Sequence, residues 1–331
     1  MAWSSAHAKL HILLRSQILL PKNSRILMAV SGGQDSLCMG RLLIELADKW
    51  QWQLAVVHCD HGWRGDSADN AAHVLTLAKA WQVPAWLEVA QSPPASEAAA
   101  RKWRYESFAK VARQQGYNYV VTGHTQSDRA ETVLYNLIRG TGTDGIGTLP
   151  WVRSLDTTSS PITLVRPLLS FSRAETIALC QQQQIPIWED STNQDLHFRR
   201  NRIRHELLPY LRSHFNPQVE SALAQIADIA TEESAYLSQQ AKDIYRQCIF
   251  QVDSKSWEIQ RAVLKQSHLA IQRRVIRQLL QSAIAQPPNF LHIEKLVALL
   301  TAPNGSQSDP YPGRWIAQVR GSIIRFTQKA S

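Results

Sequence analysis

The sequence predicts an α/β fold in which a doubly wound parallel sheet precedes a smaller, mainly helical C-terminal domain. Apolar runs of β-forming residues separated by amphipathic helical patterns support this, and they begin near Arg25, Gln53, Ala85, Asn118 and Ile162. The first four runs start 28 to 33 residues apart, which is the length of one strand plus its crossover helix. This alternation is typical of parallel strands joined by helices.

Two domains are expected because the chain has 331 residues and its pattern changes past Pro209. Apolar residues recur every three to four positions from about 215 to 300, which indicates helices. Turn residues then precede two β-type runs, which predict a short terminal hairpin. We therefore place the two domains at residues 1–212 and 213–331.

The chain carries 36 lysines and arginines against 27 acidic residues, a formal net charge of +9. Such an excess favours a polyanionic partner, nucleic acid first, although a solvated basic surface is the alternative. The four cysteines lie far apart without a Cys-x-x-Cys pair, so we expect a reducing compartment and no structural zinc or iron-sulfur cluster. No run approaches the ~20 apolar residues that span a bilayer. We expect a cytoplasmic protein with no membrane association.

A glycine-rich loop follows the first predicted strand and opens a helical pattern, and its residues are Ser31, Gly32, Gly33, Gln34, Asp35 and Ser36. Two glycines let the backbone approach an anion closely, and the following helix directs unpaired amides toward it. The loop lacks the Lys-Ser/Thr pair of a Walker A loop, which disfavours an ordinary γ-phosphate kinase. We expect a phosphate cradle, with a plain serine-glycine turn as the alternative.

Three segments with small or polar residues follow predicted strands, at 31–36, 58–61 and 123–124. In a parallel sheet, ligands lie at the carboxyl ends of the strands, so we expect the three segments to meet in one cleft. His58 and His61 lack the partners of a recognisable zinc site. We therefore favour hydrogen-bonded roles for these histidines over metal ligation.

The loop resembles the Ser-Gly-Gly-x-Asp-Ser signature of the PP-loop ATP pyrophosphatase superfamily, whose members cleave ATP between the α and β phosphates. Further segments resemble the tRNA(Ile)-lysidine synthetase family, in the order found in that family, and cover roughly the first 210 residues. These segments are 57–64, 97–105, 123–132, 136–142, 166–169, 190–193 and 198–204.

The resemblance implies ATP-dependent ligation of free L-lysine to a minor isoleucine tRNA with a CAU anticodon. The C2 carbonyl oxygen of the wobble cytidine attacks the α-phosphate of ATP, pyrophosphate leaves, and the lysine ε-amine then displaces AMP from C2. The product is lysidine, which changes the codon read from AUG to AUA. Residues 1–212 would bind ATP and catalyse the reaction, and residues 213–331 would contact the tRNA.

This chemistry requires carboxylates. Asp35 is a candidate catalytic residue and ligand of the Mg²⁺ that accompanies ATP, although it could instead shape the turn. Asp128 and Glu131, one helical turn apart, are the candidates that bind the lysine ammonium and receive its proton; the alternatives are a helix-dipole role for Asp128 and a structural role for Glu131. The family usually has Gly-His-His-x-Asp-Asp-Gln-Ala-Glu-Thr at 123–132, whereas this chain has Ser127 in place of the first Asp. One expected carboxylate is therefore missing.

Polar and basic residues in the matching segments are candidates for tRNA or phosphate contact, because an arginine fork binds phosphate through two hydrogen bonds. The candidates are Arg101, Arg104, Arg199, Asn201 and Arg204. Three of them lie in 199–204, the densest basic cluster of the chain.

Three other functions stay open on the sequence. A tRNA thiolase of the same superfamily uses the same adenylation step, but it generally needs a persulfide thiol or a Cys-x-x-Cys site, and only Cys38 and Cys59 lie close to the expected cleft. A synthetase that amidates a small metabolite would leave the basic cluster without a role. A catalytically inactive RNA-binding relative would fit the altered segment at 123–132.

Overall fold

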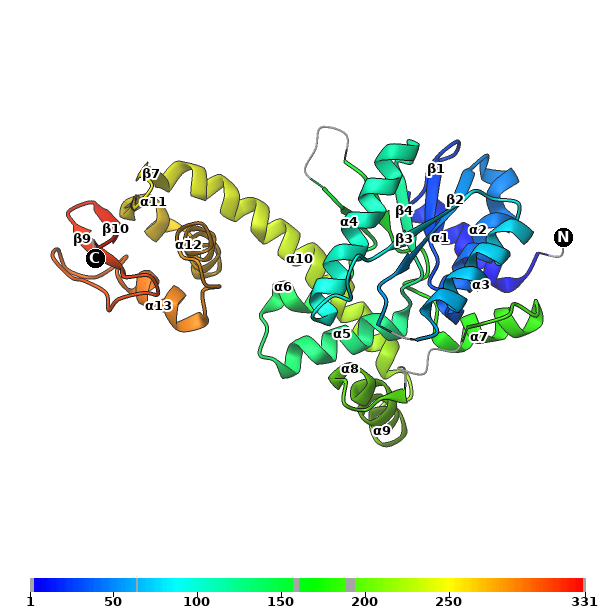
Figure 1. Ribbon diagram of the computed structural model, residues 1–331. Helices are drawn as coiled ribbons and strands as arrows, with labels where there is room; N and C mark the ends of the chain where they lie inside the picture. Colours follow the sequence, from blue (N-terminus) through cyan, green and yellow to red (C-terminus); the bar gives the residue numbers. More distant parts are fainter. Residues whose placement is uncertain (1–2, 64, 157–160, 189–193, 330–331) are drawn as a thin grey trace. The chain divides into compact units, whose positions relative to one another are not determined.

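A computed structural model describes residues 3–63, 65–156, 161–188 and 194–329, which form two compact units (Figure 1). By internal contacts the first unit ends at Thr231, within helix α10 (Val219–Cys248). The domain boundary expected after residue 212 stays a prediction. Among the described residues, no helix is both long and apolar enough to cross a membrane.

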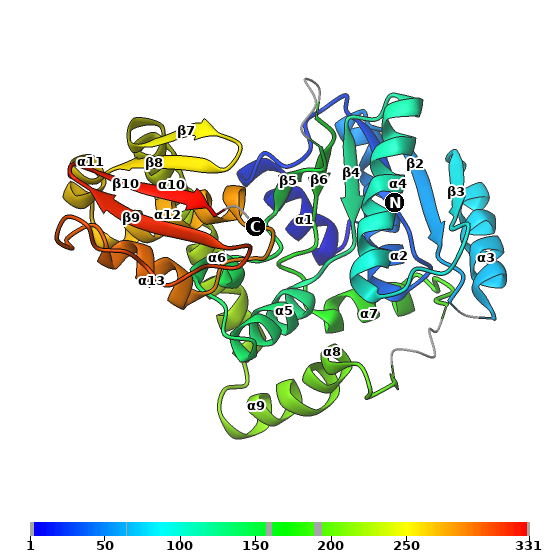
Figure 2. The ribbon, with the colours of Figure 1, turned by 60° about the vertical axis from the view of Figure 1, so that its left-hand side comes forward.

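The first unit contains a six-stranded sheet in the order β3-β2-β1-β4-β6-β5, which confirms the predicted α/β fold. Neighbouring strands are parallel except for β5, which runs antiparallel to β6 (Figure 2). Each predicted strand begins within one residue of an observed one, whereas the sequence does not predict the three-residue strand β5. The strands are β1 (Arg25–Ala29), β2 (Gln53–Asp60), β3 (Ala85–Val89), β4 (Tyr119–Thr122), β5 (Val152–Ser154) and β6 (Thr163–Val165).

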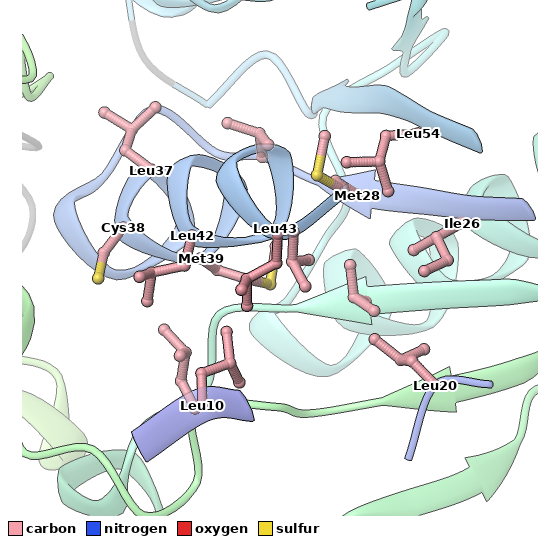
Figure 3. Packing of buried hydrophobic residues seen from close by; sticks show 14 of the residues in the cluster. Leu10, Leu20, Ile26, Met28, Leu37, Cys38, Met39, Leu42, Leu43 and Leu54 are labelled. Carbon is pink, nitrogen blue, oxygen red and sulfur yellow. The ribbon is translucent and has the colours of Figure 1, made fainter. Parts of the chain in front are cut away.

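The central strands are buried on both faces, which is why they read as continuous apolar runs. In β1, Ile26 and Met28 pack in one hydrophobic cluster while Leu27 and Ala29 pack in another, as the two-residue period of a strand requires. Figure 3 shows part of the first cluster, in which leucines of α2 (Gln34–Trp50) pack beside the sheet. This packing fixes the start of α2 at the carboxyl end of β1.

Helices connect the strands of this unit. Helix α4 (Glu97–Gln115) begins after the N-cap Ser96 and ends at Gly116, whose φ of 71° suits a left-handed cap. Helix α7 (Arg173–Gln182) begins with a capping box. The remaining helices are α1 (Ser5–Ser16), α3 (Ser67–Ala80), α5 (Gln126–Ile138), α6 (Thr143–Ile146), α8 (Arg199–Arg202) and α9 (Leu208–His214), with a π-helical turn at Ile203–Leu207.

The second unit contains a four-stranded antiparallel sheet in the order β7-β8-β10-β9. Strands β9 and β10 form a hairpin where the sequence predicts one. The sequence analysis does not predict strands β7 and β8. In β8, Trp257 and Ile259 pack against the core while Glu258 pairs with Arg325, so buried and exposed residues alternate. This alternation covers too few residues to be recognised next to the long helical patterns. The elements are β7 (Ile249–Asp253), β8 (Ser256–Gln260), α11 (Arg261–Gln266), α12 (Leu269–Ala283), α13 (Phe290–Ala298), β9 (Trp315–Arg320) and β10 (Ile323–Gln328).

A buried arginine ties α5 to the first part of α10. Arg129 is 1% exposed, and its Nη1 lies 2.6 Å from Oδ1 of Asp228, which also accepts a hydrogen bond from Trp151. Burial lowers the pKa of Arg129, and the charge of Asp228 opposes that shift. Arg129 therefore has a packing role, at a position where the related family usually has glutamine.

Replacing Asp228 with Ala is expected to destabilise the protein, because it leaves a buried cation without its partner. We expect a loss of about 1–3 kcal/mol in the free energy of unfolding, less than for a fully buried pair since Asp228 is 46% exposed. Urea denaturation followed by circular dichroism measures this loss.

Asp243→Ala is the matched control for Asp228→Ala. Asp243 lies in the same helix at 47% exposure, but its arginine partner is 74% exposed, so its loss should cost under about 0.5 kcal/mol. Equal losses in the two variants would contradict the packing role of Arg129.

Candidate active site

A cleft of about 1530 Å³ opens at the carboxyl ends of β1, β2 and β4. Residues from all three segments expected to meet, 31–36, 58–61 and 123–124, line this cleft. Residues of α3, α4, α5, α7, α8, α9, the π-helical turn and the start of α10 also line it. The first unit therefore brings together side chains that lie far apart in the sequence.

The glycine-rich loop keeps the start of α2 open. Gly32 has a φ of +87°, and a Cβ there would collide with Oδ1 of Asn70, so only glycine fits. The hydroxyl of Ser36 donates to the carbonyl of Gly33 at 2.8 Å and lies 3.1 Å from Oγ of Ser31, which braces the turn. Gly33 is the N-cap and offers no side chain to the first amides of α2. No side chain in the described part of the chain caps these amides, so they can bind an anion.

Two other strand ends support the loop. His58 is 3% exposed, and its Nδ1 lies 2.8 Å from the carbonyl oxygen of Val30, the hydrogen-bonded role expected for it. Gly123 lies so close to the loop that a Cβ there would be 2.7 Å from the carbonyl oxygen of Asp35 and 2.8 Å from Cα of Ser36. The end of β4 therefore touches the backbone of the loop directly.

Asp35 lines the cleft with one carboxylate oxygen occupied. Its Oδ1 accepts hydrogen bonds from Thr176 at 2.5 Å and from Gln34 at 3.2 Å, whereas no described residue donates to Oδ2. Burial and the negative charge of Asp128 raise the pKa of Asp35. A cation bound at Oδ2 would offset both effects.

Asp128 and Glu131 are paired with arginines of the 199–204 segment. Glu131 is fully buried, and Arg204 donates to both of its oxygens at 2.6 and 3.0 Å. Arg200 adds a bond of 2.9 Å to Glu131 and lies 3.3 Å from Oδ1 of Asp128. Burial raises the pKa of Asp128, but the charge of Arg200 and other nearby groups outweigh it and lower the pKa. Both carboxylates therefore already have cationic partners.

The predicted phosphate contacts differ in their surroundings. Arg104 lines the cleft, its Nε is buried without a hydrogen-bond partner in the described part of the chain, and burial lowers its pKa. Arg101 is exposed in the cleft wall, and Arg204 lines it while bound to Glu131. Arg199 and Asn201 do not line the cleft. Of the five, Arg104 has the clearest need for an anion.

The structure adds residues to which the sequence analysis assigned no role. Burial lowers the pKa of His124 to about 3, so this cleft residue is neutral at pH 7. Glu220, at the start of α10, lines the cleft and accepts a hydrogen bond from Ser127 at 2.5 Å. A lone glutamate in an amphipathic helix carries no sequence signal, so only the fold identifies Glu220. Arg64 and the motif residues 190–193 lie outside the described residues.

The parallel sheet, the glycine-rich loop after β1 and the arginines of the cleft define a PP-loop protein that uses ATP. Residues 4–211 match the PP-loop domain family, and residues 260–325 match the TilS substrate binding domain. The chain belongs to the tRNA(Ile)-lysidine synthase family.

Relatives in that family match nearly the whole chain. The tRNA(Ile)-lysidine synthase of Nostoc sp. is 50% identical, with 98% of this chain and 97% of that protein covered. The corresponding enzyme of Synechocystis sp. is 51% identical, with 98% of each chain covered. Among solved structures, the U34-tRNA thiolase NcsA from Methanococcus maripaludis shares the fold, with a TM-score of 0.58 at 16% identity over 68% of this chain and 77% of that one.

Gly123→Ala is expected to weaken ATP binding by at least about tenfold, because the added methyl group would displace the loop backbone and its amides. Isothermal titration with a non-hydrolysable ATP analogue measures this effect. Gly65→Ala is the control, since a Cβ at Gly65 meets nothing within 4 Å. Unchanged affinity in Gly123→Ala would show that the loop does not depend on the contact with β4.

Proposed function

We propose that this chain ligates L-lysine to C2 of the wobble cytidine of a minor isoleucine tRNA with a CAU anticodon, and cleaves ATP to AMP and pyrophosphate. The observation that carries the proposal is the 50% identity over nearly full length to a tRNA(Ile)-lysidine synthase. The cleft supports it with an open helix N-terminus, an arginine with an unpaired Nε and several carboxylates.

In the first step, the C2 carbonyl oxygen of the cytidine attacks the α-phosphate and pyrophosphate leaves. The candidates that bind the phosphates are the loop residues Ser31, Gly32, Gly33, Gln34, Asp35 and Ser36. The amides of Ser31 and Gly33 already donate to the hydroxyls of Ser36 and Ser31, so the amides at the start of α2 are the main donors. Arg104 would bind the charge that develops at the α-phosphate, because its buried Nε has no other partner among the described residues.

Asp35 fits the role of Mg²⁺ ligand, since no described residue donates to its Oδ2 and a cation there would offset the burial and the charge of Asp128 that raise its pKa. The described residues offer no group of three or more His, Cys, Asp or Glu side chains for a metal ion, so phosphate oxygens and water would complete the shell, as is common for Mg²⁺. When bound, the ion neutralises charge on the leaving pyrophosphate.

In the second step, the lysine ε-amine attacks C2 and AMP leaves. The amine must first lose a proton, so a carboxylate must bind the ammonium group. Asp128 stays the candidate for this role, although Arg200 already binds it. Glu220 adds a second carboxylate, because Ser127 and the half-exposed Arg212 bind one oxygen each and leave lone pairs available. We assign to Glu220 the carboxylate role that the family gives to position 127.

Two exposed arginines are the candidates for tRNA contact. Arg101 lies in the cleft wall and Arg199 lies outside it, and both can bind backbone phosphates. Arg204 would act through Glu131, which it binds at 2.6 Å, and Asn201 would hold the segment by donating to the carbonyl of Asp195 at 2.8 Å.

A thiolase reaction has less support, because no accessible thiolate lies in the cleft wall. Burial raises the pKa of Cys59 to about 12, which keeps its thiol protonated at pH 7. Cys38 is buried, and the adjacent Cys180 thiol together with burial raises its pKa as well.

The direct test incubates the pure protein with ATP, Mg²⁺, radiolabelled lysine and total tRNA. We expect label in a tRNA fraction and release of pyrophosphate, and we expect Asp35→Ala to reduce both by about 100-fold or more. Pyrophosphate release that depends on tRNA but transfers no label would show that the nucleophile is not lysine. If neither labelled tRNA nor pyrophosphate forms, the enzyme proposal is wrong.

Glu220→Gln is expected to raise the KM for lysine by about 10- to 100-fold while tRNA adenylation continues, since an ammonium loses a charged partner. Steady-state kinetics with varied lysine measures this change. Ser127→Asp in the Glu220→Gln background should restore lysine use, because it returns a carboxylate to the same corner of the cleft.

Glu206→Gln is the control for Glu220→Gln, since Glu206 pairs with Arg202 and does not line the cleft. An unchanged KM in Glu220→Gln, or no rescue by Ser127→Asp, would remove Glu220 from lysine binding and leave the adenylation proposal intact.

A further inference from the structure

A second cavity, of about 540 Å³, lies at the other end of α2 from the cleft. The last turns of α1 and α2 and the segment before β1 form its walls. Arg15, Lys22 and Lys49 line it together with His11 and Trp50. Helix α2 has 17 residues and is thus about 25 Å long, so a ligand in this cavity is well separated from ATP at the glycine-rich loop.

Two buried nitrogen atoms in the wall of the cavity have no hydrogen-bond partner in the described part of the chain. Trp50 is 7% exposed, and its Nε1 is unsatisfied, as is Nδ1 of His11. The two rings lie 5.4 Å apart at 67°. The neighbouring Trp52, by contrast, donates to the carbonyl of Pro21 at 2.9 Å. A buried N–H without an acceptor is unfavourable, so the indole N–H of Trp50 indicates a missing acceptor, and the imidazole of His11 can donate to the same acceptor in its Nδ1–H form.

The cavity is also strongly cationic. Among the described residues, no acidic side chain lines it, and neither Arg15 nor Lys22 forms an ion pair. Burial lowers the pKa of His11, and the positive charges of Lys49 and Arg15 lower it further. Favourable helix dipoles explain cations in the last turns of α1 and α2, but they explain neither Lys22 nor the unsatisfied nitrogens.

We infer that this cavity binds a phosphate group, through Trp50, His11 and the three surrounding cations. The side chains supply hydrogen-bond donors and positive charge, which suits a ligand that only accepts. Leu14 and Ile18 provide an apolar wall that could contact the ribose when the phosphate belongs to a nucleotide. The phosphate could belong to a free nucleotide or to the backbone of tRNA, and only the second source rests on the proposed function.

The test follows the imidazole resonance of His11 by NMR, assigned by its loss in His11→Gln, during separate titrations with inorganic phosphate, AMP and tRNA. We expect the resonance to move, and we expect Trp50→Phe or Lys22→Ala to weaken that response by about tenfold or more. Trp50→Phe keeps the ring and removes only the N–H. Lys79→Ala is the control, because Lys79 occupies the last turn of α3 as Lys49 does in α2 but lines no cavity.

The titrations separate the two sources of phosphate. A response to phosphate or AMP that Trp50→Phe weakens identifies a small-ligand site. A response to tRNA alone identifies a backbone contact. Affinity for tRNA should then depend less steeply on salt in Lys22→Ala, with the magnitude of the slope of log affinity against log salt smaller by about 0.7–0.9. No response to any of the three ligands, or equal responses in Trp50→Phe and the parent protein, would overturn the inference.

Discussion

The chemistry of the cleft depends on one constraint, which is that the first amides of α2 must stay without partners inside an otherwise packed domain. An unsatisfied backbone donor is costly when it is buried, so the fold has to keep these amides at the mouth of a cleft. Burial of α2 against the sheet fixes the direction of the helix, Gly32 turns the chain without a side chain, and β4 supports the loop through Gly123. Each of these features serves to hold the proposed anion site open.

The sequence predicts the nucleotide-binding half of the molecule well, because strand runs buried on both faces and a glycine-rich loop are strong local signals. It predicts the convergence of 31–36, 58–61 and 123–124 for the same reason, since parallel strands end at one edge of a sheet. It does not predict Glu220, because the side chain reaches the cleft only through the path of α10. It also does not predict β7 and β8, which are short strands beside long helical patterns.

The basic residues illustrate a second limit of sequence analysis. Arg199 and Arg204 belong to the same dense cluster, yet one is exposed and the other binds a buried glutamate. Arg129 is buried and paired with Asp228. A count of charges therefore overstates the positive surface available to a polyanion, and the position of each arginine relative to its nearest carboxylate decides its role.

The bonds between Glu131, Arg200 and Arg204 also have a consequence for how the family can vary. Loss of either arginine would leave a buried carboxylate underpaired, and loss of the glutamate would leave two guanidinium groups facing each other, so single changes are each unfavourable. The effects of mutations at such coupled positions on stability do not add up. We expect these three positions to covary among relatives, with compensating changes acquired together or the whole set kept.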